Sequence, residues 1–257
     1  MKAAKSVEAG VLDWPEQNAP ADGAALERPT RFRPHVVATQ KDAAFTPDDF
    51  PVASPARAFV KRCVDIALSL LALPIALVLG VPIALLIALG GGRPIYNHLR
   101  VGRDGRHFVC HKFRTMIAGA DIALEMLLAD DPELRAEWLG HFKLKNDPRV
   151  TPLGRLLRKT SLDEIPQILN VLKGEMSWVG PRPVIPQELS KYGAQASAYL
   201  ACRPGITGLW QVNGRSHTTY AERTALDMQY AKTWSIWLDV KILLLTIPRV
   251  LAARGSY

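Results

Sequence analysis

The sequence has few cysteines, and those it has form no pattern. Cys63, Cys110 and Cys202 are odd in number and show no metal-ligand spacing. This argues against a disulfide-stapled fold and against a cysteine zinc site. The three thiols fit a reducing compartment, where free cysteines are mostly buried and unreactive.

The first 55 residues lack any lasting apolar period. Seven prolines interrupt every helix that could begin there, at positions 15, 20, 29, 34, 47, 51 and 55. We interpret residues 1–55 as a disordered extension. A signal peptide is not expected, because Asp13, Trp14 and Pro15 stand where its apolar region should be.

Acidic residues are outnumbered, and no internal repeat is evident. Lys and Arg total 32 against 24 Asp and Glu, so the formal net charge is +8. The excess predicts anionic partners, such as phosphates, nucleic acid or acidic lipid. A chain of 257 residues can form one or two domains with a real core.

The segment Val64 to Leu89 is almost wholly apolar, with Asp65 and Ser69 as its polar residues. As a helix it would be about 39 Å long, more than the ~30 Å of a bilayer's hydrocarbon core. Pro74 lies near its middle and is expected to bend it. Both flanks are basic, as is usual on the cytoplasmic side. We therefore expect a helix kinked at Leu73-Pro74 that re-enters the same face; a single span is the alternative.

Two strands should follow, Pro94 to Val101 and Arg106 to Phe113, because Asp104-Gly105 between such runs is a strong hairpin signal. Alternation would place Lys112 and Arg114 on one face, as a grip for phosphate. A solvated edge strand is the structural alternative.

Further helices are predicted after the hairpin. Their ranges are Ala118 to about Leu139 with a break at Asp131-Pro132, Ile165 to Leu172, Glu188 to Leu200, Tyr220 to Lys232 and Trp234 to Arg249. Gly174 is a suitable C-cap for the second. The last is either a membrane-interface helix or a packed core helix. The glycines of the stretch 203–211 would let the backbone approach a ligand closely.

Asp163 and Glu164 form a carboxylate pair in a basic setting that includes Arg155, Arg158 and Lys159. Adjacent like charges need cations nearby, so the pair suggests a site for a metal and an anionic substrate. The alternative is a helix capping box with Ser161 as N-cap. A helix that begins at or after Asp163 tolerates Pro166 better and places both carboxylates at its positive end, which favours their ionised forms.

Two further arginines lie on turns. Arg182 stands between two prolines that hold its backbone extended, and Arg215 follows Asn213-Gly214. Each is a candidate anion contact, and an incidental turn residue is the alternative.

Taken together, these segments resemble the monotopic polyprenyl-phosphate phosphoglycosyl transferases of bacterial sugar transfer, and within them the exopolysaccharide-initiating galactosyl-phosphate transferases. The resemblance spans Lys61 to the C-terminus and rests on Lys61-Arg62, Lys112-Phe113-Arg114-Thr115-Met116, Ser161-Leu162-Asp163-Glu164-Ile165-Pro166-Gln167, Gly180-Pro181-Arg182-Pro183, Pro204-Gly205-Ile206-Thr207-Gly208 and Arg254-Gly255-Ser256-Tyr257. The family often has Ser-Pro at the helix break, where this chain has Leu73-Pro74.

The resemblance implies a mainly helical α+β fold. It would consist of a disordered extension (1–55), a kinked re-entrant membrane helix (56–92) and a catalytic domain (93–257), which carries the β-hairpin and interfacial amphipathic helices. The expected location is the cytoplasmic face of the inner membrane. The sequence leaves the oligomeric state open, a homodimer included.

The implied reaction moves a sugar 1-phosphate, galactose 1-phosphate by resemblance, from a UDP-sugar to undecaprenyl phosphate and releases UMP. Membrane lipid is a further partner, and nucleic acid is not expected. The resemblance makes Asp163 the nucleophile and gives Glu164 a role with Mg²⁺ or with the acceptor. The two carboxylates are also the expected metal ligands. UDP-glucose as donor and a non-catalytic scaffold for anionic lipid are the alternatives.

The resemblance also assigns roles to the basic residues. Arg158 would brace the carboxylate pair, Arg182 would contact the nucleotide and Arg215 would bind phosphate. Lys112 and Arg114 remain the expected phosphate grip, and Pro74 the expected break in the membrane helix.

Overall fold

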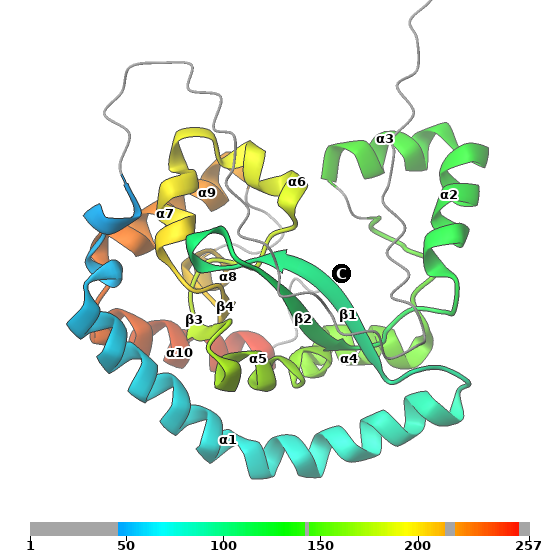
Figure 1. The fold of residues 1–257 in the computed structure, drawn as a ribbon. Helices are drawn as coiled ribbons and strands as arrows, with labels where there is room; N and C mark the ends of the chain where they lie inside the picture. The colour runs from blue at the N-terminus through cyan, green and yellow to red at the C-terminus, as the bar shows by residue number, and fades with distance from the viewer. Residues whose placement is uncertain (1–45, 142–143, 214–218, 252–257) are drawn as a thin grey trace, which may run out of the picture.

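The computed structural model describes residues 46–141, 144–213 and 219–251. It is mainly helical, with one antiparallel hairpin and one short parallel strand pair. In Figure 1 the long helix α1 (Pro55–Leu89) curves beneath the other elements, which form one body above it. The predicted mainly helical class with a small sheet is confirmed.

The strands and α-helices after α1 are β1 (Ile95–Val101), β2 (His107–Phe113), α2 (Ala120–Asp130), α3 (Pro132–His141), α4 (Pro152–Thr160), α5 (Gln167–Lys173), β3 (Ser177–Val179), α6 (Pro186–Leu189), α7 (Ala196–Ala201), β4 (Gly205–Thr207), α8 (Leu209–Asn213), α9 (Tyr220–Thr233) and α10 (Ile236–Leu251). Short 3-10 helices are η1 (Pro47–Asp49), η2 (Pro51–Ala53), η3 (Arg103–Gly105), η4 (Leu162–Glu164) and η5 (Ser190–Gln195).

Helix α1 has 35 residues, and within the described chain it is the one helix long and apolar enough to cross a membrane. Most of its apolar side chains are exposed, as a lipid environment requires. Its buried positions form two groups at helical spacing: Lys61, Asp65 and Ser69 in the first half, and Gly80, Ile83 and Ile87 in the second. Both halves therefore pack on the same body.

The helix continues through Pro74 and Pro82, although each proline removes one backbone hydrogen bond. Its path in Figure 1 is curved rather than straight. A re-entrant kink at Pro74 remains a prediction.

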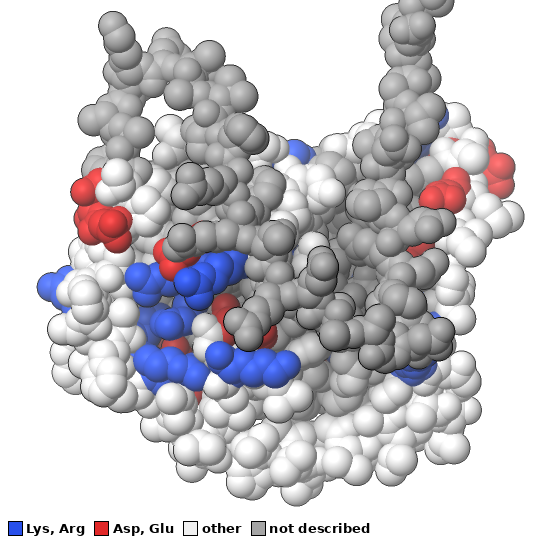
Figure 2. Space-filling view, viewed as in Figure 1, with Lys and Arg blue, Asp and Glu red and all other residues white. Residues whose placement is uncertain are grey.

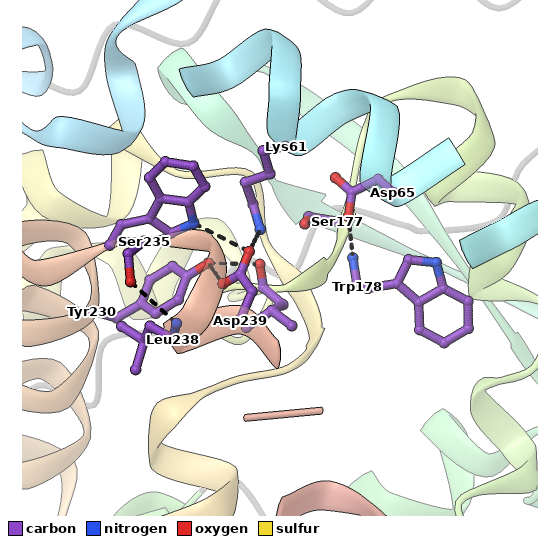
Figure 3. Close-up of polar contacts among 10 residues, drawn as sticks. Lys61, Asp65, Ser177, Trp178, Tyr230, Ser235, Leu238 and Asp239 are labelled. Carbon is purple, nitrogen blue, oxygen red and sulfur yellow. Dashed lines mark hydrogen bonds and ion pairs between the residues drawn. The ribbon is translucent and has the colours of Figure 1, made fainter. Parts of the chain in front are cut away.

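The first half of α1 is joined to the body by buried polar contacts (Figure 3). The Lys61 ammonium lies 2.6 Å from the Asp239 carboxylate in α10, and both are buried. Asp239 also accepts hydrogen bonds from Tyr230 and Trp234. One turn further on, Asp65 accepts from the Ser177 hydroxyl at 2.8 Å. These contacts fix α1 against α10 and β3.

The predicted hairpin is confirmed. Strands β1 and β2 pair antiparallel from Ile95↔Phe113 to Val101↔His107. In the turn, Asp104 has φ 57° and Gly105 φ 73°. Asp and Gly tolerate this left-handed backbone better than most residues, which is why the dipeptide ends the first strand here.

The helical predictions are correct in part. The break at Asp131-Pro132 separates α2 from α3, and α9 covers the predicted range Tyr220 to Lys232. The continuous helix expected from Glu188 to Leu200 is wrong. Gly193 there has φ 51° and ψ −127°, which no helix accommodates, so α6, η5 and α7 form separate turns.

Two glycines of the stretch 203–211, Gly205 and Gly208, serve chain packing, and the expected ligand contact stays a prediction. Strand β4 runs parallel to β3. A Cβ on Gly205 or Gly208 would clash with the backbone of Gly180, which follows β3. The absent side chains therefore let these two segments approach each other.

Helix α10 has two apolar faces with different surroundings. Ile242 lies in the main core with Trp234, Tyr230 and Val179, whereas Trp237 is 80% exposed. Core packing and an exposed interface-type face, predicted as alternatives, thus occur on opposite sides of one helix. Trp234, expected on the interface helix, instead precedes α10 and is buried.

Candidate active site

Asp163 and Glu164 lie in η4, the single 3-10 turn that joins α4 to α5. Ser161 ends α4 with φ 59°, and its side chain caps no helix. The capping-box alternative is therefore wrong. Pro166 is the N-cap of α5, so the helix begins after Asp163, as predicted. The two carboxylates precede its first turn, however, and do not lie within it.

Lys112 brings a cation to both carboxylates. Its Nζ lies 2.7 Å from Oε1 of Glu164 and 3.7 Å from Oδ2 of Asp163. Burial alone would lower the pKa of Lys112, but the charges of Glu164 and Asp163 raise it, so the lysine stays protonated. Strand β2 thus supplies the counter-charge that the carboxylate pair requires.

Asp163 is only 9% exposed. Burial raises its pKa to about 6; Lys112 opposes the shift and the neighbouring charge of Glu164 adds to it. The expected preference for the ionised form is thus outweighed by desolvation, because the carboxylate is buried and stands outside the first turn of α5.

Arg158 lies near Asp163 and its charge lowers the pKa of that residue. Its Nε donates to the Thr115 hydroxyl at 2.9 Å. Thr115 follows strand β2 and Arg158 lies in the last turn of α4. This hydrogen bond therefore joins the ends of β2 and α4 beside η4.

The predicted phosphate grip of Lys112 and Arg114 on one strand face stays a prediction. Strand β2 ends at Phe113, but the Arg114 N–H still donates to the Pro94 carbonyl at 2.9 Å. Its Nε donates to the Met116 carbonyl at 3.0 Å, and its guanidinium lies against Gly92. Within the described residues it makes no ion pair with Asp163 or Glu164.

Arg182 is exposed on the loop between β3 and α6. The loop is held by the Gly205 N–H, which donates to the Pro181 carbonyl at 2.8 Å. The charge of Arg182 lowers the pKa values of His98, Arg100 and Arg223, so it faces the hairpin and α9. Arg215 lies outside the described residues.

The carboxylate pair is the candidate for holding a metal ion. No group of three or more His, Cys, Asp or Glu side chains occurs in the described ranges. Mg²⁺ does not need one, since it binds through one or two carboxylates together with substrate phosphates. The donor set of Asp163 and Glu164 fits this requirement, provided that Glu164 shares its charge between Lys112 and the metal.

Sequence reasoning missed His98 and Arg100, which also line the inner face of the hairpin. Arg100 donates to the Pro183 carbonyl at 3.1 Å and thereby links β1 to the Arg182 loop. Tyr96, His98 and Arg100 alternate along the predicted strand, and alternation places all three on the face of the hairpin that carries Lys112. This pattern could have identified His98 and Arg100 as candidates from the sequence.

A basic surface lies beside the site. Figure 2 shows Lys and Arg side chains gathered around a few carboxylates, over the region that Figure 1 labels β3 and α5. Arg62 and Arg203 donate to carbonyls at the end of α5, those of Leu172 and Gly174. Part of the basic excess therefore has a structural role at the C-terminus of this helix.

Known proteins match most of the chain. The model of a family described as bacterial sugar transferase matches residues 56–253. A UDP-galactose-lipid carrier transferase of Erwinia amylovora and an undecaprenyl-phosphate galactose phosphotransferase of Salmonella typhimurium are each 49% identical over 199 residues, 77% of this chain. The chain spans only 42% of the length of these two relatives. The exopolysaccharide production protein ExoY of Rhizobium meliloti is 46% identical over 218 residues, which cover 83% of this chain and 95% of that protein.

Proposed function

Since the chain belongs to the bacterial sugar transferase family, we propose that it transfers a sugar 1-phosphate from a UDP-sugar to undecaprenyl phosphate and releases UMP. This would be the first membrane step of exopolysaccharide synthesis. The observation that carries the proposal is the position of the carboxylate pair. Asp163 and Glu164 lie against Lys112, and the neighbouring Ile165 and Phe113 pack on the membrane helix.

The proposed chemistry proceeds in two displacements at one phosphorus. A carboxylate oxygen of Asp163 attacks the phosphorus that bears the sugar, and the bond to the bridging oxygen breaks. The electron pair stays on that oxygen, which leaves as part of UMP. A phosphate oxygen of the lipid then attacks the same phosphorus, the bond from phosphorus to the Asp163 oxygen breaks, and its electron pair restores the carboxylate.

Charged groups around Asp163 support this chemistry. Asp163 must be ionised to attack, and Lys112 and Arg158 both lower its pKa against the effect of burial. The same cations would stabilise negative charge on the phosphoryl oxygens during transfer. Mg²⁺ held by Asp163 and Glu164 would neutralise the pyrophosphate of the donor.

The topology of α1 suits a lipid acceptor. A straight span would carry one end of the helix away from the body, yet residues in both halves pack on it. We infer that α1 enters and leaves by the same face, with the body on the cytoplasmic side of the inner membrane. A soluble nucleotide sugar and a membrane phosphate could then meet at η4.

The donor sugar follows from relatives. Two of them are named for galactose, so galactose 1-phosphate is the proposed group. UDP-glucose is the alternative donor, because the two sugars differ only in the configuration of one hydroxyl group.

The direct test is UMP release by the full chain in lipid nanodiscs, with undecaprenyl phosphate and a panel of UDP-sugars. We expect release with UDP-galactose and its loss in Asp163→Asn. The matched control is Asp104→Asn, an exposed hairpin-turn residue, which should keep full activity. Full activity of Asp163→Asn would reject the covalent route, and no turnover with any sugar would favour a lipid-binding scaffold.

Cysteine labelling tests the topology. In a Cys63→Ser background, Ala56→Cys and Gly90→Cys stand at the two exposed ends of α1. A re-entrant helix predicts that an impermeant reagent labels both from the cytoplasmic side. Labelling of Gly90→Cys from the opposite side would establish a single span.

A further inference from the structure

The inner face of the hairpin forms a continuous polar row that leads away from the carboxylate pair. Tyr96 pairs with Lys112 and His98 with Cys110, so His98 and Lys112 share one face of the sheet. Arg100 is the next residue on that face and contacts the loop of Arg182 through the Pro183 carbonyl. His98 thus lies between Lys112, which contacts the carboxylate pair (the dyad Asp163 and Glu164), and Arg182.

Arg100 fixes the tautomer of His98. Its Nη2 lies 3.0 Å from Nδ1 of the imidazole. A guanidinium can only donate, so Nδ1 accepts and the hydrogen of the neutral ring must sit on Nε2. Nε2 has no hydrogen-bond partner among the residues that the structure describes. His98 is therefore a fixed donor whose Nε2 hydrogen is available to a ligand.

The surroundings of His98 are cationic. Burial, followed by the charges of Arg100, Lys112 and Arg182, lowers its pKa to about 3, so the ring is neutral at physiological pH. Lys112 is balanced by the dyad and Arg100 by Glu188, whose carboxylate lies 3.9 Å away. Arg182 has no ion pair within the described chain. This end of the row therefore carries an unbalanced positive charge.

Building on the proposed function, we propose that His98, oriented by Arg100, and Arg182 bind the phosphate of the departing UMP. A fixed N–H donor beside an unbalanced guanidinium is suited to a phosphate oxygen. The phosphate that bears the sugar is attacked at Asp163, beside Lys112, so the Arg182 end of the row is left for the phosphate of the nucleotide half. The sugar would then lie on the other side of Asp163.

His98 would act by hydrogen bonding and not by proton transfer. The oxygen that leaves with UMP is a phosphate oxygen, which is stable as an anion near neutral pH and requires no general acid. A neutral donor at this position stabilises the charge that develops there when the phosphorus–oxygen bond breaks.

The test is the affinity of UMP for the full chain in lipid nanodiscs, measured by calorimetry without lipid acceptor or donor sugar. His98→Ala should weaken UMP binding about tenfold or more, as expected for a hydrogen bond to a charged group. His98→Gln, which keeps an N–H donor, should retain most of the affinity. Galactose 1-phosphate serves as the second probe, and its affinity should not change in His98→Ala.

The matched control is His111→Ala. His111 lies on the opposite face of the same hairpin, where its ring contacts Asn97, so UMP affinity should stay unchanged. Unaltered UMP affinity in His98→Ala, or an equal loss in His111→Ala, would overturn the proposal. So would a loss confined to galactose 1-phosphate.

The two proposals fail separately in these measurements. If UMP affinity depends on His98 but no UDP-sugar is turned over, the nucleotide subsite is supported and the transferase reaction is rejected. If the protein turns over UDP-sugar while His98→Ala binds UMP normally, the subsite alone is wrong.

Discussion

Asp227 is the clearest case of a single residue whose environment dictates its charge. It is buried in α9, where Oδ2 accepts a hydrogen bond from Tyr192 at 2.8 Å and Oδ1 has no partner in the described structure. Burial raises its pKa to about 7. A protonated carboxyl group suits a site that offers so few donors.

This shift predicts how stability depends on pH. The folded protein binds the Asp227 proton more tightly than the unfolded chain, so the stabilisation is complete below about pH 4 and is lost as the pH rises through 7. Relative to that of Asp227→Asn, the melting temperature of the unaltered chain in nanodiscs should fall between about pH 5 and pH 8 by the equivalent of about 1–3 kcal/mol. The slope that remains in the variant combines the raised pKa of Asp163 with the lowered pKa of His98, which act in opposite directions. An identical pH slope in the variant would contradict the assignment.

At the residue scale, the sequence was sufficient for the dyad but not for its surroundings. Asp163, Glu164, Lys112 and Arg158 were identified from charge pattern and resemblance, and the structure brings them together. The contacts of Arg114 with Met116 and Gly92 depend on tertiary packing, which the strand pattern alone does not reveal. A role for His98 can be inferred only from the structure, which places Arg100 and the Arg182 loop beside it.

At the scale of elements, the anchor of α1 is a buried ion pair. Lys61 is only 4% exposed and its anion is Asp239. Removing one partner of a buried pair leaves an uncompensated charge, so Asp239→Asn should destabilise the protein by about 3–5 kcal/mol. Combining it with Lys61→Met should recover part of that loss in a melting experiment, because the Lys61 ammonium is then no longer buried without its partner.

Lys241→Met is the control for this pair, since Lys241 is exposed on the same helix. It should leave the melting temperature unchanged. If Asp239→Asn behaves like this control, the pair does not anchor α1.

The second half of α1 supports the dyad through Gly80. A Cβ there would lie 3.5 Å from the Phe113 ring and 3.6 Å from a methyl group of Ile165, the neighbours of Lys112 and Glu164. We expect Gly80→Ala to be tolerated, because these are ordinary contact distances. Gly80→Leu should displace both residues and lower kcat about tenfold or more, by shifting the reacting groups.

Val78→Leu is the matched control for Gly80, because Val78 is exposed on the same helix. Its UMP release should equal that of the unaltered chain. Equal activity of Gly80→Leu and Val78→Leu would show that α1 does not position the dyad.

Element prediction succeeded where local signals were strong and failed where chain packing intervened. Asp104-Gly105 and Asp131-Pro132 ended their elements as expected. Gly193 broke a helix that its apolar neighbours favoured. The packing role of Gly205 and Gly208, whose lack of a side chain lets β4 approach the segment after β3, was not predicted.

At the scale of the whole molecule, one apolar helix and one compact body share two contact regions. The sequence alone predicted the apolar length and the basic flanks of α1. Its contacts with α10 and β3 at one end and with η4 and β2 at the other depend on tertiary packing. Together they place the carboxylate pair beside a helix suited to lipid, which is the physical basis for a reaction between a soluble donor and a membrane acceptor.

In the proposed function, Asp163 carries the sugar phosphate during transfer. Intact-protein mass spectrometry of the full chain, mixed with UDP-galactose and Mg²⁺ but no lipid acceptor, tests it directly. We expect a mass increase of one hexose phosphate that maps to Asp163, is absent in Asp163→Asn and disappears when undecaprenyl phosphate is added. Turnover of the donor without any covalent adduct on the chain would contradict it.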